Sequence, residues 1–239
     1  MKHILCLLFF LSLTTIDLTA ATHNIKEYGA IGDGKHIDSP AINAAIEAAA
    51  QNGGGTVYIP TGKYACYSIR LKSHLTIYLE AGAEIIAAFP TQTEGYDEAE
   101  ENPHNLYQDF GHSHWKNSLM WGIGLEDVTI CGPGLINGKG LTREESRLPG
   151  VGNKAISLKL CKNVILKDFS MLHCGHFALL ATGVDNLTIH NLKVDTNRDG
   201  FDIDCCRNVR ISDCSVNSPW DDAIVLKASY ALGFFRDTE

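Results

Sequence analysis

Three aspartates near the end of the chain have a spacing that could bring their carboxylates together. Asp199 lies 22 residues before Asp221, and Asp222 follows directly. Crowded carboxylates repel one another, which raises the pKa of at least one of them. One group can then keep a proton while a neighbour stays ionised, and cleavage of a glycosidic bond requires that division between acid and base. The spacing therefore predicts a catalytic carboxylate site.

The separation of these residues is that of a structural repeat. Similar segments begin at Asn163, Asn186 and Asn208, with starts 23 and 22 residues apart. Each segment has one polar residue thirteen positions after its asparagine: His176, Asp199 and Asp221. A period near 22 made of short β-rich runs is typical of a parallel β-solenoid. A β-sandwich is the competing all-β fold, but it would not predict columns of fixed period.

A helix is expected before the repeats. Ser39 is a candidate N-cap, Pro40 takes the first helical position, and Gly53 ends an apolar pattern of helical spacing. Such a helix would cover the first coil, whose core would otherwise be exposed. Further copies of the repeat start are recognisable at His74 and Asp127, with longer segments between them that we expect to form loops.

The composition limits the class of protein and its location. Residues 1–20 have the short basic start, apolar centre and small-residue end of a secretory signal peptide, so residues 21–239 are expected to form one secreted or periplasmic domain. No later run is long and apolar enough to span a membrane. The net charge is −8 and no basic run suggests a nucleic-acid partner.

Metal and cofactor binding are not expected. Seven cysteines follow residue 20 without a CxxC pair, and we expect mostly structural free thiols, with their pairing left open. His104, His112 and His114 lie in one long predicted loop, but no cysteine or carboxylate stands at ligand spacing. We therefore interpret them as surface or loop-packing histidines.

Four residues close to the aspartates are candidates for binding substrate. Trp220 could stack on a sugar ring or belong to the core, and His176 could be a site residue or a hydrogen-bonded turn histidine. Arg198 and Lys227 could contact an anionic substrate, although solvated charge is the simpler interpretation of each.

Several segments resemble glycoside hydrolase family 28, the polygalacturonase family. Residues 26–64 look like the first part of pectin-degrading β-helix enzymes, and the resemblance continues to the last residue. NRDGFDID at 197–204 and PWDDAIVLK at 219–227 resemble the family's Asn-Thr-Asp and Asp-Asp motifs. The resemblance implies a right-handed parallel β-helix that hydrolyses galacturonan or rhamnogalacturonan with inversion and without a cofactor.

The resemblance also implies a role for each aspartate. Asp221 would be the general acid that protonates the leaving oxygen, while Asp199 and Asp222 would activate the attacking water. One departure is Arg198, which stands where the family has threonine. We expect this replacement to alter specificity rather than abolish the chemistry.

A second departure concerns the motifs downstream. The family's Gly-His-Gly and Arg-Ile-Lys motifs do not appear before Glu239. The expectation is therefore a β-helix incomplete at its C-terminus, monomeric when complete, whose substrate is pectic polysaccharide or oligogalacturonide. This part alone is expected to be inactive. A β-helix polysaccharide lyase and a non-catalytic carbohydrate-binding solenoid remain as alternatives.

Overall fold

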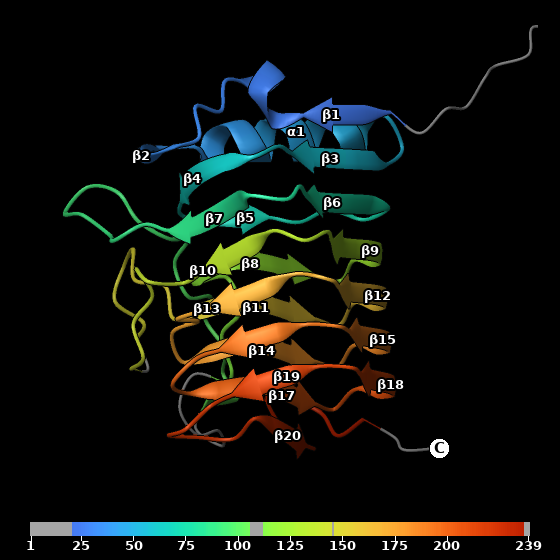
Figure 1. Ribbon diagram of the computed structural model, residues 1–239. Coiled ribbons are helices and arrows are strands. Elements are labelled where there is room, and N and C mark those ends of the chain that lie inside the picture. Colours follow the sequence, from blue (N-terminus) through green and yellow to red (C-terminus); the bar gives the residue numbers. More distant parts are fainter. Residues whose placement is uncertain (1–20, 106–111, 145, 237–239) are drawn as a thin grey trace, which may run out of the picture.

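The protein is a right-handed parallel β-helix with three sheets (Figure 1). The computed structural model describes residues 21–105, 112–144 and 146–236, so the predicted signal peptide lies outside the described residues. The chain passes through sheets 1, 2 and 3 in turn, and each passage stacks on the one before it. This confirms the solenoid predicted from the 22-residue period.

Each sheet is made of parallel strands contributed by successive coils. Sheet 1 contains β1 (Thr22–Asn24), β3 (Gly55–Ile59), β6 (Leu75–Leu79), β9 (Glu126–Cys131), β12 (Lys162–Lys167), β15 (Asp185–His190) and β18 (Arg207–Ser212). Sheet 2 contains β2 (Asp33–Ile37), β4 (Gly62–Cys66), β7 (Ala83–Ala87), β10 (Leu135–Asn137), β13 (Ser170–Leu172), β16 (Lys193–Asp195) and β19 (Ser215–Asn217). Sheet 3 contains β5 (Ile69–Arg70), β8 (Ser118–Ile123), β11 (Lys154–Lys159), β14 (Phe177–Thr182), β17 (Asp199–Asp204) and β20 (Ile224–Lys227). The described helices are the short 3-10 helix η1 (Ile25–Tyr28) and α1 (Ser39–Gln51).

A ladder of polar side chains runs along the start of the sheet 1 strands from β6 to β18. The five repeat starts predicted from the sequence (His74, Asp127, Asn163, Asn186 and Asn208) all have positive φ angles, between 53° and 60°. Asn and Asp tolerate this conformation better than most residues. The Nδ2 atoms of Asn163, Asn186 and Asn208 each donate to a side-chain oxygen on the preceding coil, at 2.8, 2.8 and 3.1 Å. The repeated residue type is thus explained by both backbone conformation and stacking.

Helix α1 covers the first coil, as predicted, but its N-cap is Asp38 rather than Ser39. The carboxylate of Asp38 makes no capping hydrogen bond within the helix. It accepts instead from the backbone N–H groups of Ile31 and Gly32, at 2.6 and 3.0 Å. Asp38 therefore ties the preceding loop to the helix, which the local sequence pattern does not reveal.

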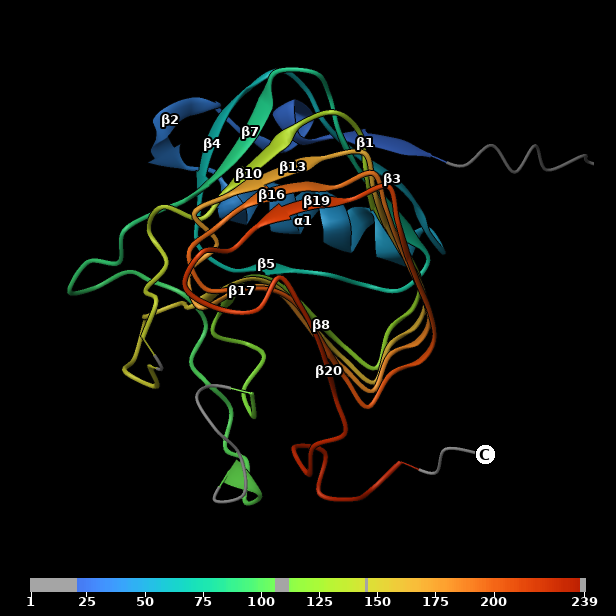
Figure 2. The same cartoon turned by 60° about the horizontal axis from the view of Figure 1, so that its bottom comes forward.

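The central strands of sheet 3, such as β14 and β17, are buried on their outer as well as their inner face. All six residues of β14 are buried. On the outer side, Phe177 and Leu180 pack with Trp115, which belongs to the long segment between β7 and β8. The segments that follow β7 and β10 extend from the same side of the β-helix (Figures 1 and 2). Inserted segments therefore cover the sheet that carries Asp199.

The cysteines agree with the expectation of structural thiols. All seven that the structure describes are free, and four of them are buried. Burial raises the pKa of Cys174 to about 12, which keeps this thiol protonated and unreactive. Neither of the described helices is long and apolar enough to cross a membrane.

Candidate functional site

The fold brings the three predicted catalytic aspartates together. Asp199 is the first residue of β17, whereas Asp221 and Asp222 lie in the turn between β19 and β20. One carboxylate oxygen from each residue lies within 4.8 Å of the others. Asp199 is buried, and Asp222 is exposed. The three side chains form an acidic group, which we call the acidic corner, between sheets 2 and 3.

The register of sheet 3 differs from the predicted column on the side of the preceding coil. Phe177, rather than His176, lies opposite Asp199. In sheet 2, Leu172 lies opposite Asp195. Phe177 lies five residues after Leu172, whereas Asp199 lies only four residues after Asp195. The column counted from the asparagines was wrong here because this turn is one residue shorter.

The register also differs on the side of the following coil. Phe201 of β17 lies opposite Ile224 of β20. The same register places Asp222, rather than Asp221, beside Asp199. The turn between β19 and β20 nevertheless gathers both carboxylates at the corner, with the N–H of Asp222 donating to Oδ1 of Asp221 at 3.1 Å. The acidic corner therefore depends on the turn and not only on strand stacking.

The surroundings of Asp199 change its protonation behaviour. Burial, assisted by the negative charges of Asp221 and Asp202 and by a hydrogen bond with Asp221, raises the pKa of Asp199 to about 7. The carboxylate of Asp221 forms an ion pair with the guanidinium of Arg198, with Nε and Oδ2 2.9 Å apart. Asp199 can therefore hold a proton near neutral pH.

His176 and Arg198 lie together behind Asp221. Nη2 of Arg198 is 3.2 Å from Nε2 of His176. Burial, followed by the charge of Arg198, lowers the pKa of His176 to about 4, so its imidazole is neutral and can accept a hydrogen bond from the guanidinium. His176 therefore orients Arg198 toward Asp221. Its predicted contact with substrate stays a prediction.

Trp220 presents a large aromatic surface beside the acidic corner. Its side chain is 79% exposed, so it does not belong to the core. The backbone N–H of Trp220 donates to the carbonyl oxygen of Asn197 at 3.2 Å, which fixes the residue next to the turn that leads to Asp199. An exposed indole at this place is available to stack on a sugar ring.

The chain is similar to proteins from several sources. A family model described as rhamnogalacturonase A/epimerase, pectate lyase-like, matches residues 22–110. A "probable polygalacturonase" of Vitis vinifera is 24% identical over 244 residues, which cover 92% of this chain and 47% of the relative. Plasmin and fibronectin-binding protein A of Streptococcus pneumoniae is 32% identical over 177 residues, which cover 70% of this chain and 23% of the relative. A family 28 exopolygalacturonase of Yersinia enterocolitica has the same fold, with a TM-score of 0.71 at 21% identity. The matched region covers 88% of this chain and 45% of the exopolygalacturonase.

The chain is therefore similar to polygalacturonases, and its fold is that of a glycoside hydrolase family 28 exopolygalacturonase. It spans about half the length, or less, of these relatives.

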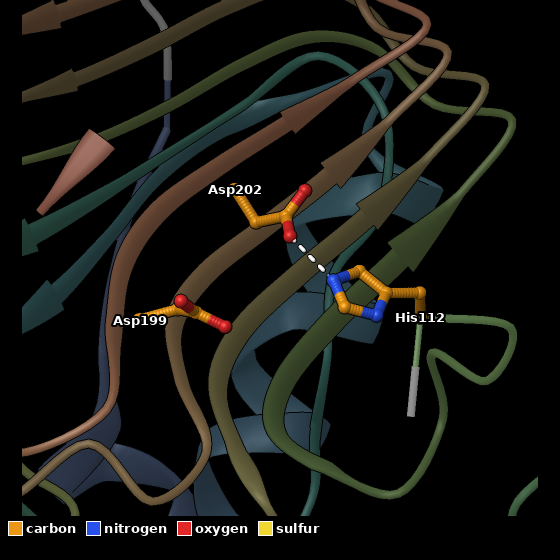
Figure 3. A group of neighbouring side chains, drawn as sticks. All are labelled: His112, Asp199 and Asp202. Carbon is orange, nitrogen blue, oxygen red and sulfur yellow. Dashed lines mark hydrogen bonds and ion pairs between the residues drawn. The ribbon is translucent and has the colours of Figure 1, made fainter. Parts of the chain in front are cut away.

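The candidate site has a second layer that was not predicted from the sequence (Figure 3). Asp202, on the same strand as Asp199, is fully buried, and its Oδ2 lies 2.6 Å from Nε2 of His112. Nζ of Lys227 lies 2.7 Å from the same nitrogen and 3.7 Å from Oδ2 of Asp202. Lys227 thus balances the charge of a buried carboxylate, and its predicted contact with substrate stays a prediction.

His112, predicted to be a surface or loop-packing histidine, is buried and joins an inserted loop to β17. It lies in the segment between β7 and β8, 90 residues before Asp202, and only 4% of it is exposed. No local spacing relates the two residues. The sequence did offer one signal, the run FDID at 201–204, which places carboxylates within an apolar strand. All residues of this strand are buried, and a buried carboxylate needs a hydrogen-bonding or charged partner.

Two groups in the candidate site could hold a metal ion by geometry alone. These are His112 with Asp199 and Asp202, and Asp199 with Asp221 and Asp222. In the first group, the ammonium of Lys227 already lies at hydrogen-bonding distance from the histidine nitrogen. In the second, the guanidinium of Arg198 pairs with Asp221. Both groups therefore contain a cation of the chain itself.

Proposed function

We propose that the protein to which this chain belongs hydrolyses glycosidic bonds in an acidic pectic polysaccharide. The observation that carries this proposal is the acidic corner, where carboxylate oxygens of Asp199, Asp221 and Asp222 lie within 4.8 Å and the pKa of Asp199 is raised to about 7. One carboxyl group can donate a proton near neutral pH while another accepts one. The similarity to polygalacturonases supports the class of substrate. Export from the cytoplasm, predicted from residues 1–20, belongs to the same proposal.

The ion pair of Arg198 suggests how a substrate would set the roles of the acids. A substrate carboxylate that binds Arg198 competes with Asp221 for the guanidinium and leaves Asp221 without its cationic partner. The proton on Asp199 then passes to Asp221 through the hydrogen bond between them. Asp221 gives it to the leaving glycosidic oxygen, and ionised Asp199, with Asp222, takes a proton from the attacking water. Inversion is carried over from the resemblance to family 28.

The direct test is hydrolysis of polygalacturonate by the purified protein, followed by counting of reducing ends. We expect Asp199→Asn and Asp221→Asn each to abolish most of the activity. A substrate whose leaving group is a nitrophenolate needs no protonation, so it should restore cleavage by Asp221→Asn but not by Asp199→Asn. An unsaturated product that absorbs ultraviolet light would indicate a lyase and would contradict hydrolysis.

A non-catalytic binding role is the second candidate. The Streptococcus pneumoniae relative is named for binding plasmin and fibronectin. The matched region covers 70% of the present chain. A binding solenoid would retain affinity for polygalacturonate in Asp199→Asn and Asp221→Asn, while the wild type would release no reducing sugar.

A further inference from the structure

A cationic pocket of about 240 Å³ opens beside the acidic corner. Its lining includes Lys139, Arg143, His173, Thr196 and Asn197. These residues come from the turns that follow β10, β13 and β16 and from the loop that continues after β10. We call this space the Lys139–Arg143 pocket.

The pocket and the acidic corner lie on the same edge of the β-helix. Strands β10, β13, β16 and β19 pair in that order, so the turns after them stack along one corner between sheets 2 and 3. The pocket occupies the earlier turns, and Asp199, Asp221 and Asp222 occupy the later ones. A saccharide chain lying along this edge would pass over both.

Two local contacts join the walls of the pocket to the catalytic residues. The backbone of Arg143 hydrogen-bonds His176, whose Nε2 accepts from Arg198. Asn197, which lines the pocket, accepts from the backbone N–H of Trp220. A ligand group held in the pocket would therefore be held at a fixed distance from the acidic corner.

The charges of the pocket are available to a ligand. Lys139 and Arg143 are exposed, and no aspartate or glutamate lines the pocket. Within residues 21–105, 112–144 and 146–236, neither side chain forms an ion pair, whereas Arg70, Arg198 and Arg236 each pair with an aspartate. An unpaired arginine with a neighbouring lysine is well suited to bind a carboxylate, because the guanidinium can donate two parallel hydrogen bonds.

We infer that the Lys139–Arg143 pocket binds the carboxylate of a uronic acid residue next to the bond that is cleaved. Its volume is below the range of roughly 300–1,000 Å³ for pockets that enclose drug-sized ligands, so it suits one sugar residue rather than several. The inference rests on the proposed function for the position of the cleaved bond. The preference for a negatively charged sugar rests on the pocket itself.

The test is binding of trigalacturonate and of its carboxyl-reduced, neutral analogue to the chain, measured by isothermal titration calorimetry. Charge-assisted hydrogen bonds predict that Lys139→Gln with Arg143→Gln weakens binding of trigalacturonate roughly tenfold or more. Binding of the neutral analogue should change less than about twofold. The matched control is Lys162→Gln, which removes one charge from an exposed residue of sheet 1.

Each outcome decides the inference. Equal losses for the charged and the neutral ligand, an unchanged affinity in both single variants and the double variant, or no binding of trigalacturonate to the wild type would overturn it. Thermal unfolding shows whether the double variant folds, and the single variants Lys139→Gln and Arg143→Gln give the answer if it does not. If trigalacturonate binds through the pocket but the complete protein releases no reducing sugar from polygalacturonate, the proposed function alone is overturned.

Discussion

The same stacking of coils produces two polar columns with opposite properties. In the amide ladder of sheet 1, Asn163, Asn186 and Asn208 alternate donors and acceptors, so stacking satisfies each side chain. In the acidic corner, Asp199 and its acidic neighbours have only acceptors when they are ionised, so stacking crowds like charges. A repeat therefore stabilises the fold where its polar residues are amides. Where they are carboxylates it concentrates charge, which can be used for proton transfer.

The largest effect is expected when a carboxylate of the acidic corner is replaced by an amide. In the active protein, Asp199→Asn should reduce hydrolysis of polygalacturonate by roughly 10²- to 10⁴-fold, because a group that exchanges a proton with water or substrate is lost. The assay is the release of reducing sugar. Asp213→Asn is the matched control, since its carboxylate is 70% exposed and lies away from the corner; a comparable loss there would contradict a special role for Asp199.

The network behind the corner is expected to have the next largest effect. His112→Ala removes the hydrogen-bond partner of the fully buried Asp202 and releases the inserted segment from β17. We expect a loss of about 3 kcal/mol in the free energy of unfolding, measured by urea denaturation. His36→Ala, at an exposed histidine of β2, should change stability by less than about 0.5 kcal/mol. Equal effects of the two substitutions would refute this role of His112.

The reverse conversion places a carboxylate in the amide ladder. Asn186→Asp removes the donor to Oδ1 of Asn163 and sets negative charge beside it, which should cost about 2 kcal/mol at neutral pH. Acidification should restore much of this, because the protonated carboxyl group can donate again. Gln92→Glu makes the same chemical change at an exposed loop residue and serves as the control. A loss independent of pH would argue against the donor–acceptor account of the ladder.

The smallest expected effect is on stability as a function of pH. The pKa of Asp199 is raised in the folded state from 3.8 to about 7, so the folded state holds this proton more tightly than the unfolded state. The contribution of this group to the free energy of unfolding is fully present below about pH 4 and is lost as the pH rises to about 7. Asp199→Asn lacks this loss, so at pH 8 it should exceed the wild type by on the order of 1–2 kcal/mol. Thermal unfolding across this pH range measures the difference, and parallel curves would contradict it.

Some features were predictable from the sequence because they depend on local pattern or on the repeat. The positions of α1 and of the ladder asparagines follow from helical spacing and from a period near 22. The period also brings Asp199 near Asp221 and Asp222, although the turn between β19 and β20 decides how the three carboxylates meet. The register at the corner was not predictable, because the turn before Asp199 is one residue shorter than its neighbour.

Other features depend on contacts between distant segments. His112 reaches Asp202 from an inserted loop, and no repeat constrains the position of that loop. The Lys139–Arg143 pocket likewise combines a loop with turns of three coils. Periodicity can place residues of one column on one edge, but it does not indicate which inserted side chains fold over that edge.

The most direct test of the central claim is the titration of the Asp199 carboxyl group by carbon-detected NMR, assigned by comparison with Asp199→Asn. The crowding of acids at a buried corner predicts a midpoint near pH 7, which moves toward lower pH in Asp221→Asn because a negative neighbour is removed. A midpoint near 4 that does not respond to Asp221→Asn would show that the corner holds no proton near neutral pH, and would contradict its proposed role in acid–base catalysis.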